Sequence, residues 1–366
     1  MSAPTVSVVM SVFNGERWLS EAIESILNQT FHDFEFIIIN DGSTDGTASI
    51  LDSYAGSDPR VRVYHQENKG LIVSLNRGCG LAQGKYIARM DADDIAVRDR
   101  LQWQIEFMER HAEIGAVGGA VEFIDSRGRA LYTAHFPVQD EEINSALLRH
   151  CALPHSGAVI RKEAFLSVGG YRILFVDAED HELWLRIAER WRLANLEAVV
   201  VKYRIHADQA SCQKPRQQTL SALAAHAFAS LRRNGSPEPL ISEERITSEV
   251  LARLGVDQAA QQRALEGTYA YLIELMSRAS QDDAVLRLFE ELIDPSKSAP
   301  VDKRAVSNSM LWVAGIHYRR GSPVRALACV GRAVLTRPIV AGRPLKRALK
   351  SFFRRIKAKK TVREDH

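Results

Sequence analysis

The first ninety residues alternate between short, almost continuously apolar runs and longer segments that are apolar on one face. Residues 6–13 are rich in β-branched side chains, and similar runs lie at 36–39, 61–64 and 85–90. Such runs are typical of strands buried on both faces of a sheet. Segments 18–27 and 71–83 have the apolar spacing of amphipathic helices. This alternation predicts right-handed βαβ units and an α/β fold with a mostly parallel sheet.

Polar residues stand where these apolar runs stop. Asn14 follows the first run, Asp41 follows the second, and three aspartates follow the fourth, in Met90-Asp91-Ala92-Asp93-Asp94. In parallel α/β sheets, ligands bind beyond the carboxyl ends of the strands. We therefore expect three separate loops to line one crevice at that edge.

The aspartate cluster has two interpretations. Clustered carboxylates at a strand end aim several hard oxygen ligands at one point, and Mg²⁺ or Mn²⁺ favours such ligands while keeping positions open for phosphates. The simplest chemistry is then a metal that holds a diphosphate. Aspartates also gather in turns, where they cap helices and accept local hydrogen bonds. The cluster by itself leaves both interpretations open.

Four blocks of this chain match one known family in their order and spacing. They read SVVMSVFNGERWLSEAIESILNQTF, FEFIIINDGSTDGT, ENKG…LNRG…AQGKYIARMDADD and AEDHELWLRIA. Over residues 4–206 the chain resembles the family 2 inverting glycosyltransferases of GT-A fold, which build bacterial polysaccharides and cell-surface glycans. The resemblance implies a Rossmann-like sheet flanked by helices. It also implies transfer of a sugar from a nucleotide-sugar donor to an acceptor hydroxyl, assisted by Mn²⁺ or Mg²⁺.

The resemblance assigns a set of donor-binding residues. Loop backbone after Val12, with Asn14, would line the base and ribose, and Asp41 would accept a hydrogen bond from the base ring. Asp91 would reach the ribose or a metal-bound water. Asp93 would bind the metal, which bridges the two phosphates and neutralises the departing diphosphate. Uridine is the base that the resemblance favours.

Purely structural roles are the alternatives for several of these aspartates. Asp41 and Asp45 can organise a turn through local hydrogen bonds. Asp94 can cap a helix that we expect to begin near Arg98. For Asp94 the capping role and a functional role are weighed equally.

Transfer also needs a base, because an acceptor hydroxyl is a poor nucleophile until its proton is removed. The segment Glu179-Asp180-His181-Glu182 places carboxylates at the start of a helix whose apolar face is formed by Leu183, Trp184, Ile187 and Ala188. By resemblance, Asp180 is the base and Glu179 lies on the acceptor side. The plain alternative is that the helix dipole favours acidic residues at this end.

Two further segments carry predicted contacts. A strand expected to start near Ala198 ends in Arg204 and His206, and the resemblance places Arg204 at the donor and His206 near the diphosphate and the metal. A guanidinium suits phosphate but equally holds a carboxylate of the fold, and a histidine after a strand is often an ordinary turn residue. The segment Pro154-His155-Ser156-Gly157 matches an acceptor-side loop, which makes His155 an acceptor-side residue.

Composition favours a soluble globular protein. The chain has 366 residues, 46% hydrophobic and 25% charged, and we expect a catalytic domain at 1–215 and an α-helical domain at 216–338. No apolar run approaches the 18 residues or so of a membrane span, and the N-terminus lacks the features of a signal peptide. The four cysteines have no paired spacing. A cytoplasmic protein is the resulting expectation.

Beyond residue 210 the strand signals disappear. Helical patterns run through 219–233, 242–254, 257–278, 281–293 and 303–335. The last of these loosely resembles half of a tetratricopeptide repeat, but stable arrays need about three repeats. A helical appendage to the catalytic domain is the favoured interpretation.

The predicted tail, 339–366, is strongly basic. Ten Lys or Arg residues stand against two acidic residues in 343–366, a local charge of +8, so the rest of the chain carries −5. Leu345, Leu349, Phe352, Phe353 and Ile356 fall at helical spacing, and a basic amphipathic helix can lie on an anionic membrane. We expect residues 343–363 to make a peripheral contact with the inner membrane face, near a lipid-linked acceptor. A solvated end is the alternative, and nucleic acid is not an expected partner.

The sequence thus predicts a metal-assisted glycosyltransferase that acts on a saccharide or lipid-linked acceptor. A sugar-phosphate nucleotidyltransferase is one rival, but it needs a Gly-rich phosphate loop, and Ser11-Val12-Phe13-Asn14-Gly15 has none. A non-catalytic sugar- or nucleotide-binding scaffold is the other. Such a scaffold would be expected to lack the metal or base carboxylates, and both are present.

Overall fold

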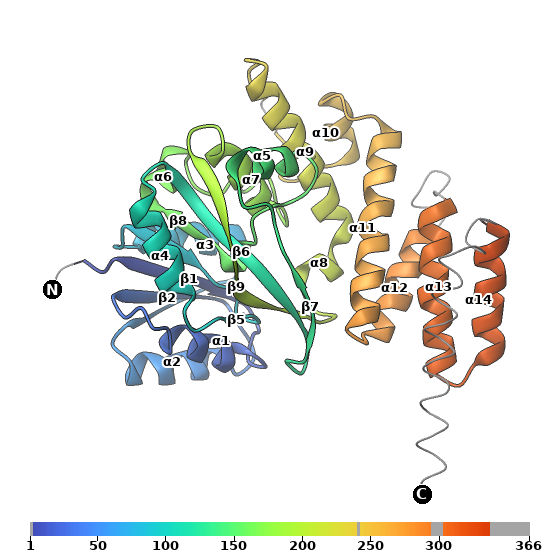
Figure 1. Ribbon diagram of the computed structural model, residues 1–366, viewed down its shortest axis with the longest axis horizontal. Helices are drawn as coiled ribbons and strands as arrows, with labels where there is room; N and C mark the ends of the chain where they lie inside the picture. Colours follow the sequence, from blue (N-terminus) through green and yellow to red (C-terminus); the bar gives the residue numbers. More distant parts are fainter. Residues whose placement is uncertain (1–2, 240–241, 294–302, 337–366) are drawn as a thin grey trace, which may run out of the picture. The chain divides into compact units, whose positions relative to one another are not determined.

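The computed structural model describes residues 3–239, 242–293 and 303–336, and within them nine strands form one sheet (Figure 1). The strand order is β3-β2-β1-β4-β8-β6-β9-β5, with β7 paired to β6. The first four strands run parallel: β1 (Val6–Val12), β2 (Phe34–Asp41), β3 (Val61–Gln66) and β4 (Tyr86–Arg89). They are connected by α1 (Leu19–Leu27), α2 (Thr47–Ser57) and α3 (Leu71–Leu81). The predicted βαβ order is confirmed.

Burial explains the nearly continuous apolar composition of these strands. Every residue of β1 and β2 is buried, so neither strand alternates between apolar and polar positions. Helix α1 turns Leu19, Ala22, Ile23 and Ile26 into the core beside these strands. Burying one such aliphatic side chain contributes about 1.5–3 kcal/mol. The apolar pattern therefore fixes which face of each element meets the sheet.

The second half of the sheet is mixed. The short strand β8 (Val159–Arg161) is antiparallel to both β4 and β6 (Ile114–Asp125), so β6 again runs with β4, and β9 (Arg192–Ile205) is parallel to β6. Strands β5 (Ile95–Ala96) and β7 (Ala130–Ala134) pair antiparallel with β9 and β6. The helical segments here are α4 (Arg100–Arg110), α5 (Asp140–Leu147), the 3₁₀ turn η1 (His155–Gly157), α6 (Lys162–Ser167) and α7 (Glu179–Ile187). Most of the sheet is parallel, as predicted.

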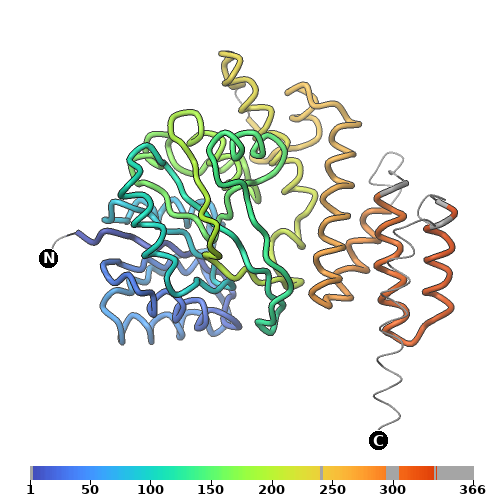
Figure 2. Tube along the Cα trace, in the orientation of Figure 1, coloured from blue at the N-terminus to red at the C-terminus, as the bar shows by residue number. Residues whose placement is uncertain are grey.

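The described chain forms two compact units. The first joins Met1–Ile205 with Leu220–Gly255, and the second joins His206–Thr219 with Val256–His366. The units thus alternate along the chain around the predicted boundary at residue 215, and the extents 1–215 and 216–338 stay predictions. The predicted tail, 339–366, lies outside the described residues. Figure 2 follows the path of the chain, with the blue and green strands forming the sheet.

The remaining elements are helical. They are α8 (Ala210–Gln213), α9 (Pro215–Arg233), α10 (Ser248–Arg253), α11 (Gln258–Arg278), α12 (Asp282–Ile293), α13 (Lys303–Arg319) and α14 (Pro323–Thr336). In the second unit α11 packs on α12 and α13, and α13 packs on α14. No helix in the described part of the chain is long and apolar enough to cross a membrane.

Two predicted boundaries are wrong. The pattern at 303–335 is two helices, because Gly321 takes a φ of 74° that ends α13 and Pro323 then begins α14. Strand β9 begins at Arg192 rather than near Ala198. Its register with β6 shifts around residues 196–199, and this irregularity interrupts the apolar alternation that marks a strand.

Candidate functional site

Strands β1, β2 and β4 end at one edge of the sheet, and the predicted polar residues gather there. Val12 lies opposite Asn40 across β1 and β2, and Val9 lies opposite Arg89 across β1 and β4. The three strands therefore end at nearly the same height in the sheet, within a few residues of one another. This edge carries Asn14, Asp41 and the cluster 91–94, as the sequence predicts.

The loops after β1 and β2 hold each other. Asn14, with φ 52°, accepts a hydrogen bond at Oδ1 from the Thr44 amide (2.8 Å) and donates its own amide to Ser43 Oγ (2.9 Å). Asp45 Oδ2 accepts from the amide of Glu16 (3.1 Å). Asparagine tolerates the left-handed conformation better than most residues. These bonds fix the backbone after Val12 at the place where the donor base is predicted to lie.

Asp41 is surrounded by donors from the chain itself. Its Oδ1 accepts from Gln66 Nε2 (2.7 Å) and the Lys69 amide (2.8 Å), and its Oδ2 accepts from the Gly70 amide (2.9 Å). The side chain therefore organises the turn that leads into α3, as the structural alternative proposes. A carboxylate has about four acceptor positions, so one is left on Oδ2 for the predicted contact with a base.

The carboxylates after β4 crowd one another. Asp91 accepts from the buried guanidinium of Arg89. Burial raises the pKa of Asp91, Arg89 lowers it, and Asp93 and Asp180 raise it again, so that the net shift is upward. Burial and the charges of Asp93 and Asp91 raise the pKa of Asp94 well above its ordinary value. The carboxyls after β4 therefore resist ionisation, partly because their charged forms repel one another.

Asp94 does not cap a helix, and that alternative is wrong. Helix α4 begins at Arg100 with Asp99 in the capping position. The side chain of Asp94 is buried, and its Oδ1 accepts from the backbone amide of Arg204 (2.8 Å) on β9. It thus ties the loop after β4 to a strand on the far side of the sheet.

Two buried arginines beneath the cluster were not predicted. Arg100 donates to three main-chain carbonyls, those of Arg89 (2.6 Å), Ser156 (2.8 Å) and Ala158 (3.2 Å). Burial and the nearby charge of Arg89 lower the pKa of Arg100 to about 9. Ser156 in turn accepts at Oγ from the amide of Asp91 (3.1 Å). The signal available in the sequence was a lone arginine, Arg89, inside an otherwise apolar run.

The predicted base stands in the first turn of α7. Asp180 Oδ1 accepts from the amide of His181 (2.6 Å), and the Cys151 thiol lies 3.7 Å from its Oδ2. Burial raises the pKa of Asp180, and the hydrogen bonds and Arg89 only partly reverse this. Asp91 and Asp180 lie close enough for the charge of Asp180 to raise the pKa of Asp91, and the charge of Arg89 lowers the pKa of both.

Glu179 and His155 form a second group beside Asp180. His155 Nε2 lies 2.8 Å from the hydroxyl of Tyr171, and its Nδ1 lies 4.0 Å from Glu179 Oε1. Burial, with the charges of Asp180 and Asp177, raises the pKa of Glu179 to about 8. Burial, together with Arg89, holds the pKa of His155 well below its usual value. At neutral pH this group therefore consists of an uncharged histidine and a largely protonated glutamic acid.

Arg204 lies near the end of β9, and His206 directly follows the strand. Arg204 is buried; its Nε donates to the carbonyl of Asp93 (2.8 Å) and its Nη2 to Glu21 Oε2 (2.5 Å). It thus holds a carboxylate of the fold, which was the alternative to the predicted donor contact. His206 belongs to the second unit, where its amide donates to Gln209 Oε1 (2.9 Å). Its predicted metal contact stays a prediction.

A divalent cation fits the chemistry of the aspartate cluster. Asp91 and Asp94 have raised pKa values partly because of neighbouring carboxylates, and a cation would offset that repulsion. Within the described residues no three His, Cys, Asp or Glu side chains are arranged to hold a metal ion. The protein would therefore supply few ligands, and phosphate and water oxygens the rest, as is common for Mg²⁺ sites.

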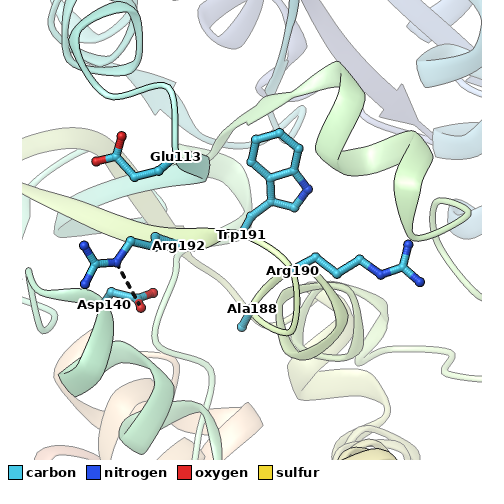
Figure 3. A pocket seen from close by; sticks show the side chains of 6 residues that line it. All are labelled: Glu113, Asp140, Ala188, Arg190, Trp191 and Arg192. Carbon is cyan, nitrogen blue, oxygen red and sulfur yellow. Dashed lines mark ion pairs between the residues drawn. The ribbon is translucent and has the colours of Figure 1, made fainter.

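A hollow of about 430 Å³ lies elsewhere (Figure 3). It is lined by Glu113, Asp140, Ala188, Arg190, Trp191 and Arg192, and it includes the Arg192–Asp140 ion pair (3.7 Å). Glu113 directly precedes β6, Arg190 to Arg192 lie at the start of β9, and Asp140 and Ala188 lie at the ends of α5 and α7. Since both strands run with β4, the hollow is at the opposite edge of the sheet from the carboxylates.

Comparison with known proteins supports the sequence resemblance. The family model described as glycosyl transferase family 2 matches residues 7–169. An uncharacterized glycosyltransferase of Haemophilus influenzae is 32% identical over 234 residues, covering 60% of this chain and 72% of the relative. The O-antigen biosynthesis glycosyltransferase WbnJ of Escherichia coli is 34% identical over 231 residues, covering 62% and 86%.

Solved structures share the fold at low sequence identity. S. aureus TarS 1–349 in complex with UDP-GlcNAc has a TM-score of 0.52 and 16% identity, with 89% of this chain and 90% of TarS covered. The mannosyltransferase PcManGT of Pyrobaculum calidifontis, in complex with GDP-Man and Mn²⁺, has a TM-score of 0.50 and 18% identity, with 92% and 89% covered. The predicted GT-A architecture with following helices is confirmed.

Proposed function

Because the chain belongs to glycosyltransferase family 2, we propose that it moves a sugar from a nucleoside-diphosphate sugar to an acceptor hydroxyl by a single inverting displacement. The proposed donor is a UDP-sugar. The proposed acceptor is a growing glycan or a lipid-linked saccharide. Family membership removes the support for both rivals, the nucleotidyltransferase and the non-catalytic scaffold.

The observation that supports this mechanism is that two carboxylate groups, those of Asp91 and Asp180, lie near one another, with Asp91 bound to Arg89. Asp91 follows β4 and accepts from the Arg89 guanidinium, Asp180 lies in the first turn of α7, and the charge of Asp180 raises the pKa of Asp91. A crevice with a donor-binding carboxylate on one wall and a base on the other suits attack by a hydroxyl on a bound sugar. The distance between the reacting groups is then set by the sheet and by α7 rather than by mobile loops.

In the proposed displacement, Asp180 accepts the proton of the acceptor hydroxyl. The hydroxyl oxygen forms a bond to the anomeric carbon, while the bond from that carbon to the diphosphate oxygen breaks and the diphosphate leaves with the electron pair. A base works best when its pKa approaches the working pH. The upward shift of Asp180 is in the favourable direction. Glu179 and His155 would lie beside the acceptor and orient it.

On the donor side, backbone after Val12, with Asn14 and Asp41, would bind the base and ribose, and Asp91 would reach the ribose. Asp93 would hold Mn²⁺ or Mg²⁺, which would supply Lewis-acid stabilisation of the leaving diphosphate. The metal contact of His206 stays a prediction from the sequence. Arg204 would act on the donor indirectly, because its guanidinium holds the carbonyl of Asp93.

Nucleotide binding tests this proposal directly. Purified protein would be titrated calorimetrically with UDP, GDP and dTDP, with Mn²⁺ and then with EDTA. We expect metal-dependent binding of one nucleotide that is lost in Asp93→Ala. Asp52→Ala is the matched control, because the Asp52 side chain is 68% exposed on α2. A folded protein that binds none of the three nucleotides would contradict the proposed donor site.

We also propose a cytoplasmic location with peripheral membrane contact through residues 343–363. The support is the local charge of +8 around an apolar stripe, and each basic side chain near an anionic surface contributes about 1 kcal/mol. Deletion from Arg343 is expected to abolish binding to anionic liposomes and to spare nucleotide binding. Equal liposome binding by the full and shortened chains would refute the contact.

A further inference from the structure

One face of helix α14 packs on α13 (Figure 1). Ala326 and Ala333 lie on this face and are buried, and the carbonyl of Ala333 accepts a hydrogen bond from Ser307 Oγ on α13 (2.9 Å). Both helices belong to the second unit. The two alanines are about two helical turns apart on the same side, so this side of α14 is fixed against its neighbour.

The opposite face of α14 presents apolar side chains to solvent. Val324, Leu327 and Leu335 are 79%, 69% and 83% exposed. Ala328 and Gly331 between them are exposed as well. At about 3.6 residues per turn, these five positions fall within about 100° of one another, opposite the buried alanines. Together they form one apolar surface, the α14 stripe, and a contiguous exposed apolar surface is typical of an interaction site.

Two exposed arginines, Arg325 and Arg332, border one side of the α14 stripe. They belong to a strongly basic part of the chain, since residues 303–363 contain seventeen Lys or Arg and no Asp or Glu. That segment therefore carries +17, whereas residues 1–302 carry −12. Such a charge asymmetry between two parts of a chain is typical of proteins that bind an anionic surface, either nucleic acid or membrane.

Two acidic residues of α12 pair with arginines at the end of α13. Asp283 binds Arg320 (2.7 Å), and Asp282 binds Arg319. These arginines come before the first residue of α14, Pro323. The two ion pairs therefore join α12 to α13 and do not offset the positive charge beside the α14 stripe.

We propose that the α14 stripe, with Arg325 and Arg332, docks on an anionic lipid surface. A helix with an apolar face bordered by basic side chains lies in the plane of an anionic bilayer, with its apolar face at the boundary of the acyl chains. Nucleic acid would bind the arginines through its phosphates but would leave the exposed leucines in water. The apolar stripe therefore favours the membrane over nucleic acid.

This surface adds a second membrane contact to the one proposed for residues 343–363, which follow α14 in the sequence. Attachment through one weak contact is reversible. A second contact on the same chain strengthens it, because the second binding event is then intramolecular. The inference deepens the proposed peripheral attachment, but it rests on α14 and not on the transfer reaction.

Cosedimentation of the full-length chain with vesicles tests this surface without nucleotide or activity. The vesicles contain phosphatidylglycerol and phosphatidylcholine in equal parts, and phosphatidylcholine alone is the uncharged comparison. The variant is Leu327→Gln with Leu335→Gln, because both side chains are already in solvent and glutamine is a good helix former. The matched control is Leu166→Gln with Ile173→Gln, which removes two apolar side chains of the first unit that are each 60% exposed.

We expect the parent to bind the anionic vesicles and the α14 variant to bind them at least about tenfold more weakly, because apolar side chains that leave water favour binding. The control should bind as the parent does. Hydrogen exchange of the amides in 323–336 should slow when anionic vesicles are added to the parent.

Equal vesicle binding by the α14 variant and the parent would overturn the proposal. Tighter binding by the variant would also overturn it, because the stripe would then be covered by apolar residues of 343–363 that the substitutions release. If sedimentation velocity shows that the variant loses a dimer while its vesicle binding is unchanged, the stripe belongs to a second copy instead. Binding to duplex DNA but not to vesicles would assign the arginines to nucleic acid. Failure to bind any nucleotide would contradict the proposed donor site alone.

Discussion

The turns after β2 and β4 both bring carboxylates to the same edge of the sheet, but they treat them in opposite ways. Asp41 receives three hydrogen bonds from the protein, two of them from backbone amides. Asp91 and Asp94 instead have raised pKa values, from burial and from the charges of nearby carboxylates. In the turn after β2, the carboxylate of Asp41 stabilises the local structure. In the second turn burial and mutual repulsion disfavour the charged forms of Asp91 and Asp94, and a bound cation would relieve that repulsion.

The start of α7 extends the contrast. Glu179 is buried with a pKa raised to about 8, and Asp180 is raised as well. Structural carboxylates normally have lowered pKa values, because hydrogen bonds and cations favour their charged form. Clusters with raised pKa values are common at functional sites. Raised pKa values therefore mark Asp91, Asp94, Glu179 and Asp180 as a group of carboxyls held close together in buried surroundings.

The largest expected effect is at the base. Asp180→Asn keeps the size of the side chain but removes the proton acceptor, so turnover should fall by about 10²–10⁴-fold, the usual contribution of general-base catalysis. The affinity for UDP in the presence of Mn²⁺ should stay near that of the parent. Steady-state assays and calorimetry measure the two quantities. Glu163→Gln, an exposed residue on α6, is the control. Normal turnover in Asp180→Asn would remove Asp180 from the mechanism.

The next largest expected effect is on the free energy of unfolding, and it compares the turns after β2 and β4. Asp41→Asn puts an NH₂ group where amides donate, so the free energy of unfolding should fall by about 1–3 kcal/mol. Asp94→Asn should cost clearly less, because the amide oxygen can still accept from the Arg204 backbone and a repelled charge is removed. Urea denaturation without metal measures both. Equal losses would mean that the two turns do not differ in the way described.

The last expected effect is the pH dependence that Glu179 contributes. Its folded pKa of about 8 is above the ordinary value of 4.5, so the folded protein holds a proton that the unfolded chain releases between these values. The stability from Glu179 is therefore complete below about pH 4.5 and is lost as the pH rises through 8. One group changes the free energy of unfolding by at most about 1.4 kcal/mol per pH unit.

Glu179→Gln should remove this pH-dependent loss of stability. The melting temperature of the variant, relative to that of the parent, should therefore rise steadily from pH 5 to pH 8. Buried histidines such as His181, with a pKa lowered to about 4, act in the opposite direction, gaining stability as the pH rises. Comparing the two proteins at each pH cancels that contribution. A gap independent of pH would show that Glu179 is not held protonated.

Much of the fold could be predicted because its first half is local. The runs at 6–13, 36–39 and 61–64 are β1, β2 and β3 within two residues or so at each end, and total burial explains their composition. The helix expected at 71–83 is α3, which ends at Leu81. Strands β1, β2 and β3 pair in sequence order, so the pattern along the chain predicts this part of the topology.

The rest depends on contacts that no local pattern records. Strand β8 has three residues and is antiparallel to its neighbours, which is too short for a periodic signal. Arg100 serves carbonyls from two distant segments, and its sequence context is that of an ordinary helix start. Arg204 was assigned to the donor by resemblance, yet Glu21 on α1 binds its guanidinium. Such pairings are decided by the three-dimensional fold.

The long strand β9 has a consequence for how the protein assembles. The paired residues Val6 and Phe34 are fairly close in the sequence. The pairs Val117–Ala194 and Ile95–Lys202 join residues that are much farther apart in the sequence. Closing a long loop costs conformational entropy, and the contacts that offset this cost form only afterwards. Such pairings therefore form late. The amides of β1 and β2 should gain protection from hydrogen exchange before those of β9 during refolding. The carboxylates of Asp91 and Asp180 would then come together only in the last step of folding. By that time the sheet that holds them against their mutual repulsion has formed.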